Sequence, residues 1–302
     1  MSQKITVRVP ATSANCGPGF DSLGLACNLY NYFTYEIISK GFTLEVQGEG
    51  AGALQASSHN LAFAAFLKVW NKMTATHIGL KVTMQNNIPL ARGLGSSSTA
   101  IVAGLIAANK LTGEQLSPED LVGLATEIEG HPDNVAPAIL GGITISYLQA
   151  EKAHTLRFLP TQPLKFIAVV PNMPLATSIA RKVLPKTVTH SDAVFNTGRS
   201  ALLIASLLTG DYTHLPVALE DKLHQPYRAT LIPGLTAAFS AAQKQGAYNA
   251  IISGAGSTLM AYAPLTSDHA AIGASMVTAL KNHGVTAAYH ILDLDTEGAI
   301  IV

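Results

Sequence analysis

The chain has 302 residues, of which 48% are hydrophobic and only 13% are charged, a composition typical of globular rather than disordered proteins. Its length suits two domains of about 150 residues each. Nineteen Lys and Arg side chains balance nineteen Asp and Glu side chains, so no basic field exists to attract nucleic acid or an anionic membrane over long range.

The cysteine content and the N-terminus indicate the compartment. Cys16 and Cys27 are too few for a disulfide scaffold and suit a reducing environment. The first ten residues have the alternation of a strand and lack the apolar core of a signal peptide. Every apolar run is interrupted well before the roughly 20 residues that span a bilayer. We therefore expect a soluble, cytoplasmic protein.

The first part of the chain is predicted to be rich in strands, with helices inserted between them. This order favours an α+β fold over a doubly wound one. The pattern predicts a strand over 5–9 that Pro10 ends, strands over 31–38 and 42–47 joined by a short hairpin link at 39–41, a helix over 60–72 and a strand over 80–85.

A glycine-rich segment follows, and it has the composition of a phosphate-binding loop. Gly93 and Gly95 let backbone N–H groups approach an anion closely, and four hydroxyl residues, 96–99, stand where an apolar helix is expected to begin. No Gly-Lys-Ser/Thr follows, so the loop is not a Walker A motif. It is not a dinucleotide-binding fingerprint either, because Ser98 stands where that motif needs its third glycine. The alternative is an ordinary glycine-rich turn before a capped helix.

The remaining elements finish the first half and then form a second half, which starts near Arg157. Ser117 is expected to cap a helix that runs to Ile128, and residues 130–142 are expected to form a loop. A βαβ-like half is expected to follow. The predicted elements are strands over 143–148, 165–171, 250–253, 259–262 and 287–292, helices over 176–184, 194–208, 234–245 and 269–282, and a less regular stretch over 211–220.

Three motifs together resemble a known family. They are Thr-Ser-Ala-Asn-Cys-Gly-Pro-Gly-Phe-Asp-Ser-Leu-Gly at 12–24, Pro-Leu-Ala-Arg-Gly-Leu-Gly-Ser-Ser-Ser at 89–98 and Ile-Ser-Gly-Ala-Gly-Ser-Thr-Leu at 252–259. In this order they resemble the GHMP small-molecule kinases, named for galactokinase, homoserine kinase, mevalonate kinase and phosphomevalonate kinase. His-Pro-Asp-Asn-Val-Ala-Pro at 131–137 and the segment 177–185 narrow the resemblance to homoserine kinases.

The resemblance implies a fold and an activity. It implies an N-terminal ATP-binding domain over 1–155, similar to domain 2 of ribosomal protein S5, and a ferredoxin-like C-terminal domain over 156–302. The implied activity is the ATP-dependent phosphorylation of the side-chain hydroxyl of L-homoserine to O-phospho-L-homoserine, in threonine biosynthesis. The alternatives are a GHMP kinase for another small alcohol, of the shikimate or mevalonate type, and a catalytically inactive sensor. A homodimer is expected, and no nucleic acid or membrane partner.

The resemblance also implies where ATP and Mg²⁺ bind. Mg²⁺ is a hard cation that prefers oxygen ligands, and Ser97 with Glu129 is expected to supply them, Glu127 being the alternative carboxylate. The expected nucleotide-binding residues are Pro89, Leu90, Ala91, Arg92, Gly93, Leu94, Gly95, Ser96, Ser97, Ser98, Thr99, Gly254 and Gly256.

Homoserine presents a carboxylate, an ammonium group and a hydroxyl, and the family positions supply a partner for each. Arg181 and Arg228 are expected to bind the carboxylate with paired hydrogen bonds. Asp21, together with Asn15, is expected to accept from the ammonium or to orient the hydroxyl. His131 and Asn134 are expected to close the site.

The predicted catalytic residues are Asn15, Asp21, Asn134 and Thr177, with Thr177 helping to position the γ-phosphate. In mevalonate-kinase-like relatives an aspartate is the base, and alignment puts the amide Asn134 at that place. We therefore expect no conventional general base, and Asp133 as base is the competing hypothesis.

Overall fold

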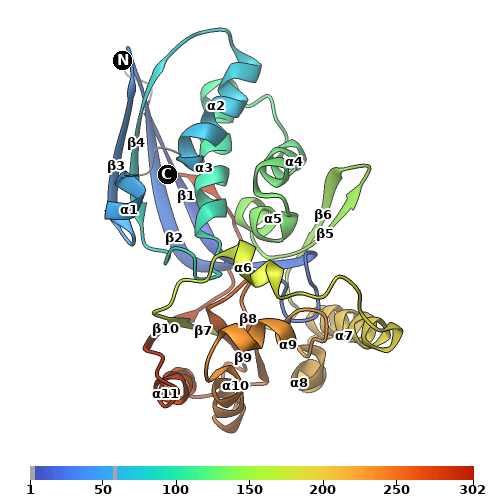
Figure 1. The fold of residues 1–302 in the computed structure, drawn as a ribbon. Helices are drawn as coiled ribbons and strands as arrows, with labels where there is room; N and C mark the ends of the chain where they lie inside the picture. Colours follow the sequence, from blue (N-terminus) through green and yellow to red (C-terminus); the bar gives the residue numbers. More distant parts are fainter. Residues whose placement is uncertain (1–3, 57–59) are drawn as a thin grey trace.

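The computed structural model describes residues 4–56 and 60–302, and it has two halves that each contain a β-sheet (Figure 1). The sheet of the first half has the strand order β11-β1-β2-β4-β3, and β5 and β6 form a ribbon that pairs with the start of β2. These strands are β1 (Lys4–Ala14), β2 (Leu23–Ile38), β3 (Phe42–Gly48), β4 (Gly79–Asn86), β5 (Ile143–Gln149), β6 (Lys152–Phe158) and β11 (Ile300–Ile301).

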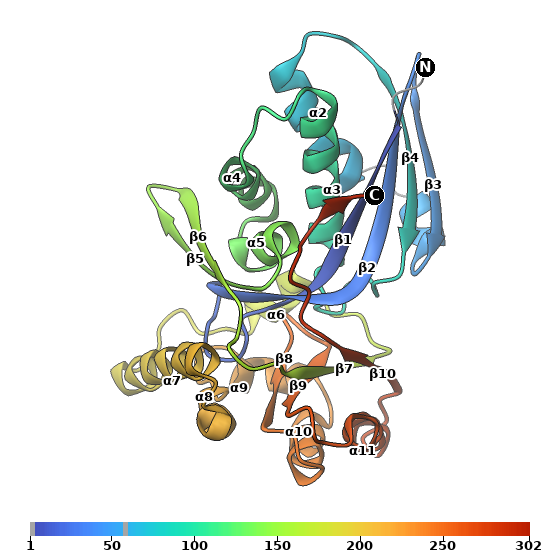
Figure 2. The same cartoon turned by 180° about the vertical axis from the view of Figure 1, so that it is seen from behind.

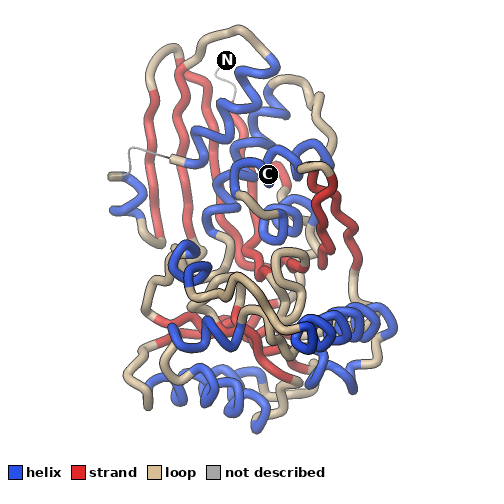
Figure 3. The backbone as a smooth tube through the Cα atoms, turned by 45° about the vertical axis from the view of Figure 1, so that its right-hand side comes forward, coloured by secondary structure: helices blue, strands red, loops and turns tan. Residues whose placement is uncertain are grey.

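Helices cover one face of this first sheet (Figure 3). The central one is α3 (Ser96–Leu111), whose residues are mostly buried against β1, β2 and α2. A helix that is apolar nearly all round is expected to lie inside a domain. The other helices of this half are α1 (Ala51–Gln55), α2 (Leu61–Met73), α4 (Pro118–Glu129) and α5 (Pro132–Leu140).

The second half has a sheet of order β10-β7-β9-β8, in which each neighbouring pair is antiparallel. Its strands are β7 (Lys165–Pro171), β8 (Asn249–Ile252), β9 (Leu259–Ala263) and β10 (Ala287–Leu292). Helices α10 (Leu235–Lys244) and α11 (His269–Lys281) pack on one face. The remaining helices are α6 (Thr177–Lys182), α7 (His190–Thr209), α8 (Leu215–Ala218) and α9 (Gln225–Arg228), with 3₁₀ turns at Tyr212–His214 and Ala229–Leu231.

The two halves share a hydrophobic core because β7 and β9 alternate apolar side chains toward both faces of their sheet. Ile167 and Val169 point toward α10 and α11. Phe166 and Ala168 point the other way, into a cluster with residues of the first half such as Leu25. The second sheet is therefore buried on both sides, and the halves form one packed unit.

The predicted hairpin at 39–41 is wrong. Strand β4 lies between β2 and β3, antiparallel to β2 and parallel to β3. Local alternation predicts that a segment is a strand, but it does not determine which strand becomes its neighbour.

The prediction that Pro10 ends the first strand is also wrong, because β1 continues to Ala14. The pairing with β2 shifts register between Pro10 and Ala11, which is a β-bulge or a related irregularity. A bulge is one of the places where a sheet tolerates proline. This continuation carries the first strand into the functional region.

Residues 130–142 were predicted as a loop, but they are largely helical. Pro132 lies at the first turn of α5, where its missing N–H costs nothing. Pro137 lies inside the helix and leaves the carbonyl of Asp133 without its helical donor. Most of α5 is buried, so packing maintains a helix that its prolines disfavour.

Several elements had no counterpart in the prediction, among them α1, β6, α9 and β11. Strand β11 crosses back from the second half to pair with β1 (Figure 2). The expected boundary between residues 155 and 156 falls inside β6, which pairs with β5 along its length. We propose that β6 belongs wholly to the first domain and that the last strand, β11, also belongs to that domain.

In the described ranges, no helix has the length and apolar character to cross a membrane.

Candidate active site

A cavity of about 360 Å³ lies between the two halves. Its walls come from the start of α3, the loop after β1, the end of α4, the start of α5, helix α6, helix α9 and the turn between β8 and β9. Such a volume suits a small-molecule ligand. Most residues singled out in the sequence lie along it.

The glycine-rich loop ends where the sequence predicts, because α3 begins at Ser96 with Gly95 as its N-cap. Gly95 has a φ of 70°, and a Cβ there would lie 2.0 Å from Thr12 Oγ1. Gly93 has a φ of 81°, and a Cβ there would lie 2.2 Å from the carbonyl oxygen of Ser253. Both positions therefore need glycine for conformation and for close packing. Helix α3 directs its free N–H groups and positive dipole end at the cavity.

The expected nucleotide-binding residues divide into two sets. Those that line the cavity are Leu90, Ala91, Arg92, Gly93, Gly95, Ser96, Ser97, Gly254 and Gly256, whereas Pro89, Leu94, Ser98 and Thr99 are not among its lining residues. The guanidinium of Arg92 donates to the carbonyls of Pro171 and Leu90, so its side chain fastens the loop to the second half.

Glu129 lies at the end of α4 beside the first turn of α3. Its Oε1 accepts hydrogen bonds from Ser97 Oγ at 2.9 Å and from Ser98 Oγ at 3.0 Å. Glu127 instead forms an ion pair with Lys68 at 2.7 Å. Among the described residues, no cluster of three or more His, Cys, Asp or Glu side chains could hold a metal by itself.

The loop after β1 has an unusual backbone at the site. Asn15, Cys16 and Asp21 have positive φ values of 69°, 47° and 55°, although none is glycine. Asn15 stabilises this conformation because its Oδ1 accepts from the N–H of Asp21 at 3.0 Å and its Nδ2 donates to Gly254 O at 2.9 Å. Backbone strain of this kind concentrates at functional sites.

Asp21 and Arg181 bind each other across the cavity. Arg181 Nη1 and Nη2 donate to the two carboxylate oxygens of Asp21 at 3.0 and 2.7 Å. The hydrogen bond to Asp21 raises the pKa of Arg181, against the opposing effect of partial burial. Thr177, one turn earlier on α6, is exposed and also lines the cavity.

Arg228 is almost fully enclosed, with only 2% of its surface exposed, yet it lines the same cavity. Burial, together with the nearby positive charge of Arg181, lowers its pKa to about 10 against the attraction of Asp21. The guanidinium is held by the carbonyls of Ala180 and Gly254. It therefore remains charged at neutral pH, and an anion is its natural partner.

His131, Asp133 and Asn134 come from the start of α5. His131 Nδ1 lies 2.6 Å from Asp133 Oδ1. Burial lowers the pKa of His131, but the hydrogen bond and charge of Asp133, together with Glu129, outweigh burial and raise it overall. Asn134 Oδ1 accepts from Thr12 Oγ1 at 2.8 Å.

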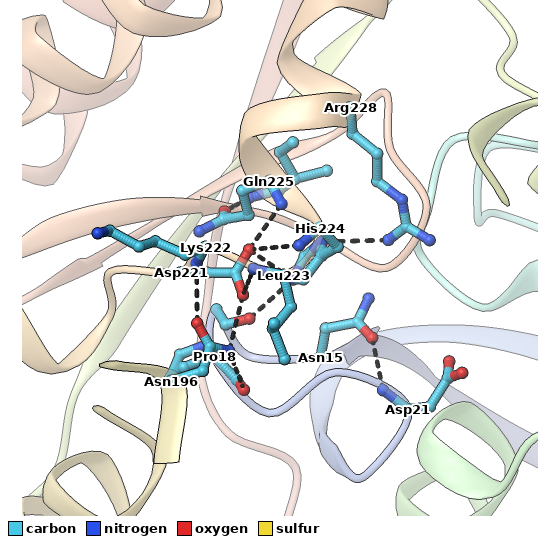
Figure 4. A network of polar contacts seen from close by, with 12 residues as sticks. Asn15, Pro18, Asp21, Asn196, Asp221, Lys222, Leu223, His224, Gln225 and Arg228 are labelled. Carbon is cyan, nitrogen blue, oxygen red and sulfur yellow. Dashed lines mark hydrogen bonds and ion pairs between the residues drawn. The ribbon is translucent and has the colours of Figure 1, made fainter. Parts of the chain in front are cut away.

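One part of the cavity was missed from the sequence. It is lined by Leu54, Asn60, Leu61, Met84 and Asn86, which come from α1, the start of α2 and the end of β4. These residue types are common in cores and at helix caps, so only the folded structure shows that they line the cavity. The buried cluster around Asp221 and His224 was also missed as part of the site (Figure 4).

Comparison with known proteins assigns the family. The pattern described as "GHMP kinases N terminal domain" matches residues 60–142, and "GHMP kinases C terminal" matches residues 203–282. A homoserine kinase of Nostoc punctiforme is 44% identical over 98% of this chain and 97% of that protein. One from Desulfitobacterium hafniense is 40% identical over 99% of this chain and 100% of that protein. The chain belongs to the homoserine kinase family.

Solved structures agree with membership in the homoserine kinase family. A crystal structure of homoserine kinase from Cytophaga hutchinsonii has a TM-score of 0.90 at 28% identity, covering 100% of this chain and 98% of that one. A mevalonate kinase of L. major has a TM-score of 0.70 at 16% identity over 98% and 96% of the two chains, so it shares the fold. The expected two-domain GHMP kinase architecture is therefore confirmed.

Proposed function

We propose that this protein transfers the γ-phosphoryl group of ATP to the side-chain hydroxyl of L-homoserine, giving ADP and O-phospho-L-homoserine for threonine biosynthesis. The observation that carries the proposal is one cavity with two unlike ends. One end has a helix N-terminus preceded by glycines, and the other has Asp21, Arg181 and Arg228. The first suits a polyphosphate, and the second suits a zwitterionic amino acid.

The phosphates of ATP are proposed to lie against the backbone between Gly93 and Ser97. The first N–H groups of α3 have no acceptor within the helix, so they can donate to phosphate oxygens. The apolar end of the cavity, at Leu54, Leu61 and Met84, is proposed to enclose the adenine ring. The loop has no lysine, so backbone amides and the helix dipole must supply most of the binding from this side.

Ser97 and Glu129 fit a magnesium ion, because a hydroxyl and a carboxylate oxygen already lie 2.9 Å apart beside the proposed phosphate site. Mg²⁺ binds through few protein oxygens and keeps several waters. When bound there, it would neutralise charge on the phosphates. Ser98, which donates to the same carboxylate oxygen, would keep Glu129 oriented. The pairing of Glu127 with Lys68 favours Glu129 for this role.

Homoserine is proposed to enter between Asp21 and the two arginines. Its α-carboxylate would bind Arg181 and Arg228, and its ammonium group would bind Asp21. The ion pair between Asp21 and Arg181 would then be replaced by ion pairs between each of these side chains and the substrate. Thr177, His131 and Asn134 line the space toward the phosphates and are proposed to position the reacting groups.

Catalysis is proposed to rest on positioning and charge neutralisation, which supply most of the rate enhancement in phosphoryl transfer. Asn15 holds the backbone of Asp21, and Asp21 orients the substrate. The hydroxyl proton would pass to the transferred phosphate or to solvent as the new O–P bond forms. Asp133 is the competing base, but its carboxylate is engaged by His131 at 2.6 Å.

An ADP-release assay with a panel of alcohols tests the proposal. L-homoserine should give Mg²⁺-dependent turnover, whereas mevalonate, shikimate and galactose should give little. Preference for shikimate or mevalonate would show a GHMP kinase of different specificity. ATP binding without turnover of any alcohol would indicate an inactive sensor.

Two further expectations belong to this proposal. We place the reaction in the cytoplasm, in keeping with Cys16 and Cys27, which are both buried free thiols. A homodimer is expected from the family resemblance, and sedimentation in solution would measure the oligomeric state.

A further inference from the structure

A buried polar cluster lies beside Arg228 and the loop that carries Asn15 and Asp21 (Figure 4). Its members are Asp221, His224 and Gln225, with 8%, 0% and 8% of their surfaces exposed. Burying so many polar groups is costly unless each is hydrogen-bonded. The proposed reaction uses none of them directly, so their arrangement needs another explanation.

Asp221 fixes the backbone on which His224 stands. Its carboxylate accepts from the N–H groups of Leu223, His224 and Gln225 at 3.0, 2.9 and 2.6 Å. It also accepts from Asn196 Nδ2 of α7 at 2.9 Å. The start of α9 is therefore held rigidly, and the imidazole of His224 has little freedom to move.

The contacts of His224 determine its tautomer. Nε2 lies 2.7 Å from the carbonyl oxygen of Gly17, which can only accept, so Nε2 carries the proton. Nδ1 lies 3.3 Å from Arg228 Nη1, which can only donate, so Nδ1 is the acceptor. A neutral ring satisfies both neighbours.

The charges around the ring agree with a neutral imidazole. Burial lowers the pKa of His224 most strongly, Asp221 opposes that effect, and Arg228 lowers the pKa further. The Gly17 carbonyl and the more distant Asp21 oppose it weakly. Phe20 stacks on the ring with centroids 5.2 Å apart and excludes water from that side.

His224 thereby joins the two substrate-binding elements. Gly17 belongs to the loop that carries Asn15 and Asp21, and Arg228 is the buried arginine of the cavity. Two further hydrogen bonds fix the guanidinium of Arg228: Nε donates to Ala180 O at 3.2 Å, and Nη1, which also contacts His224, donates to Gly254 O at 2.9 Å. Within the described residues, Nη2 makes no hydrogen bond, so it is the donor left for a ligand.

We propose that His224 is a positioning residue for homoserine: held by Gly17, it orients Arg228 so that Nη2 meets the substrate carboxylate. This inference rests on the proposed function, because it assumes that Arg228 binds that carboxylate. It assigns His224 no contact with substrate or with the reacting atoms. Removing the Nδ1 acceptor of His224 should impair homoserine binding without a matching loss of ATP binding.

Two substitutions separate the two hydrogen bonds. His224→Gln keeps a donor near the Nε2 position for Gly17, but it has no acceptor at the Nδ1 position. His224→Asn keeps an acceptor near Nδ1 for Arg228, but it is too short to reach Gly17. His269→Gln is the matched control, because His269 Nε2 bonds a carbonyl, that of Pro264, at 2.9 Å on the remote helix α11.

Steady-state kinetics should distinguish the variants. His224→Gln should raise the KM for homoserine about tenfold, the effect of losing one hydrogen bond to a charged group, with little change in the KM for ATP. His224→Asn should raise it less, and His269→Gln should not change it. Equal rises in both KM values, or no rise in His224→Gln, would overturn the proposal.

A measurement that needs no turnover tests the same geometry. The ¹⁵N signals of the His224 ring in the wild-type protein should show a protonated Nε2 and an unprotonated Nδ1 at neutral pH. A protonated Nδ1 would overturn the proposal even if the variants failed to fold. If the wild type phosphorylated another alcohol, the proposed function would fail, whereas the ring signals would still report on the bond to Arg228.

Discussion

Arg181 and Asp21 lie 160 residues apart in the chain, and they form a two-pronged ion pair across the cavity at 2.7 and 3.0 Å. Each side chain is 38% exposed, so the pair is accessible to solvent and to ligand. Both charges face the place where a zwitterion is proposed to bind. Because a zwitterion carries both opposite charges, it can separate the pair without leaving either side chain unpaired.

Removing one side of this pair should affect the amino acid more than the nucleotide. Arg181→Ala should raise the KM for homoserine about 10- to 100-fold, since hydrogen bonds between charged groups contribute about 1.5–3 kcal/mol. The KM for ATP should change little. Arg199→Ala is the control, because Arg199 pairs with Glu220 at 3.1 Å outside the cavity lining. A comparable loss for both substrates would contradict the placement of Arg181.

Glu129 and Glu127 should behave differently toward magnesium. Glu129→Gln should lower kcat strongly and shift the Mg²⁺ dependence to higher concentration, because it removes a charged oxygen beside Ser97. Glu127→Gln should stay near wild type, since it removes only a surface ion pair with Lys68. Initial rates over a magnesium titration at fixed ATP would measure both. The opposite ranking would transfer the metal role to Glu127.

Gly95→Ala should disrupt the loop that is proposed to bind the phosphates of ATP. The new Cβ would meet Thr12 Oγ1 at 2.0 Å and Asn134 Oδ1 at 3.2 Å, in a backbone that already has positive φ. Overpacking typically costs about 1–3 kcal/mol, in addition to the left-handed penalty of about 1–2 kcal/mol. ATP affinity by calorimetry and Tm should both fall.

Gly113→Ala is the matched control for this substitution. Gly113 follows the other end of α3 and also has positive φ, 97°, but its Cβ would meet nothing within 4 Å. It should lower Tm by the conformational penalty alone and leave ATP affinity unchanged. Equal loss of ATP affinity in both variants would mean that the close packing at Gly95 is irrelevant to binding.

The His131–Asp133 pair predicts a pH dependence of stability. Because the pKa of His131 is raised in the folded protein, the pair stabilises fully below the ordinary histidine value of about 6.5. That contribution is lost as the pH rises through the raised pKa. The stabilisation of the wild type relative to His131→Gln should therefore decrease as the pH rises above about 6.5. A difference that grew with pH would show that His131 is neutral in the pair.

Asp133→Asn tests the competing general base. Loss of a true general base costs about 10²- to 10⁴-fold in rate. We expect a fall in kcat of less than about tenfold, because the carboxylate is already engaged by His131 and phosphoryl transfer depends mainly on positioning. A larger fall with unchanged Tm would instead support Asp133 as the base.

The conformation of the glycine-rich loop before α3 could be predicted from the sequence because it is local. Glycines at positions of positive φ, hydroxyl residues and an apolar run follow one another directly, and α3 begins at Ser96 as expected. The Asp21–Arg181 pair could not be derived from spacing, because it depends on how the second sheet packs under the first. The resemblance named both residues, but it did not show that they bind each other.

The predictions from sequence that were wrong or incomplete also concern features that depend on tertiary packing. The insertion of β4 between β2 and β3 is a choice of partner, which local alternation does not determine. The helix α5 survives its internal proline because its apolar residues are buried. His224 belongs to a stretch already noted before Arg228, yet its role depends on a carbonyl 207 residues away in the chain.

Strand β11 pairs with β1, so residues 300 and 301 lie against residues 7 and 8. During synthesis on the ribosome, this edge of the first sheet therefore stays unpaired until about residue 300 has been made. Nascent chains halted before residue 300 should therefore leave this edge of β1 open and remain vulnerable to proteases.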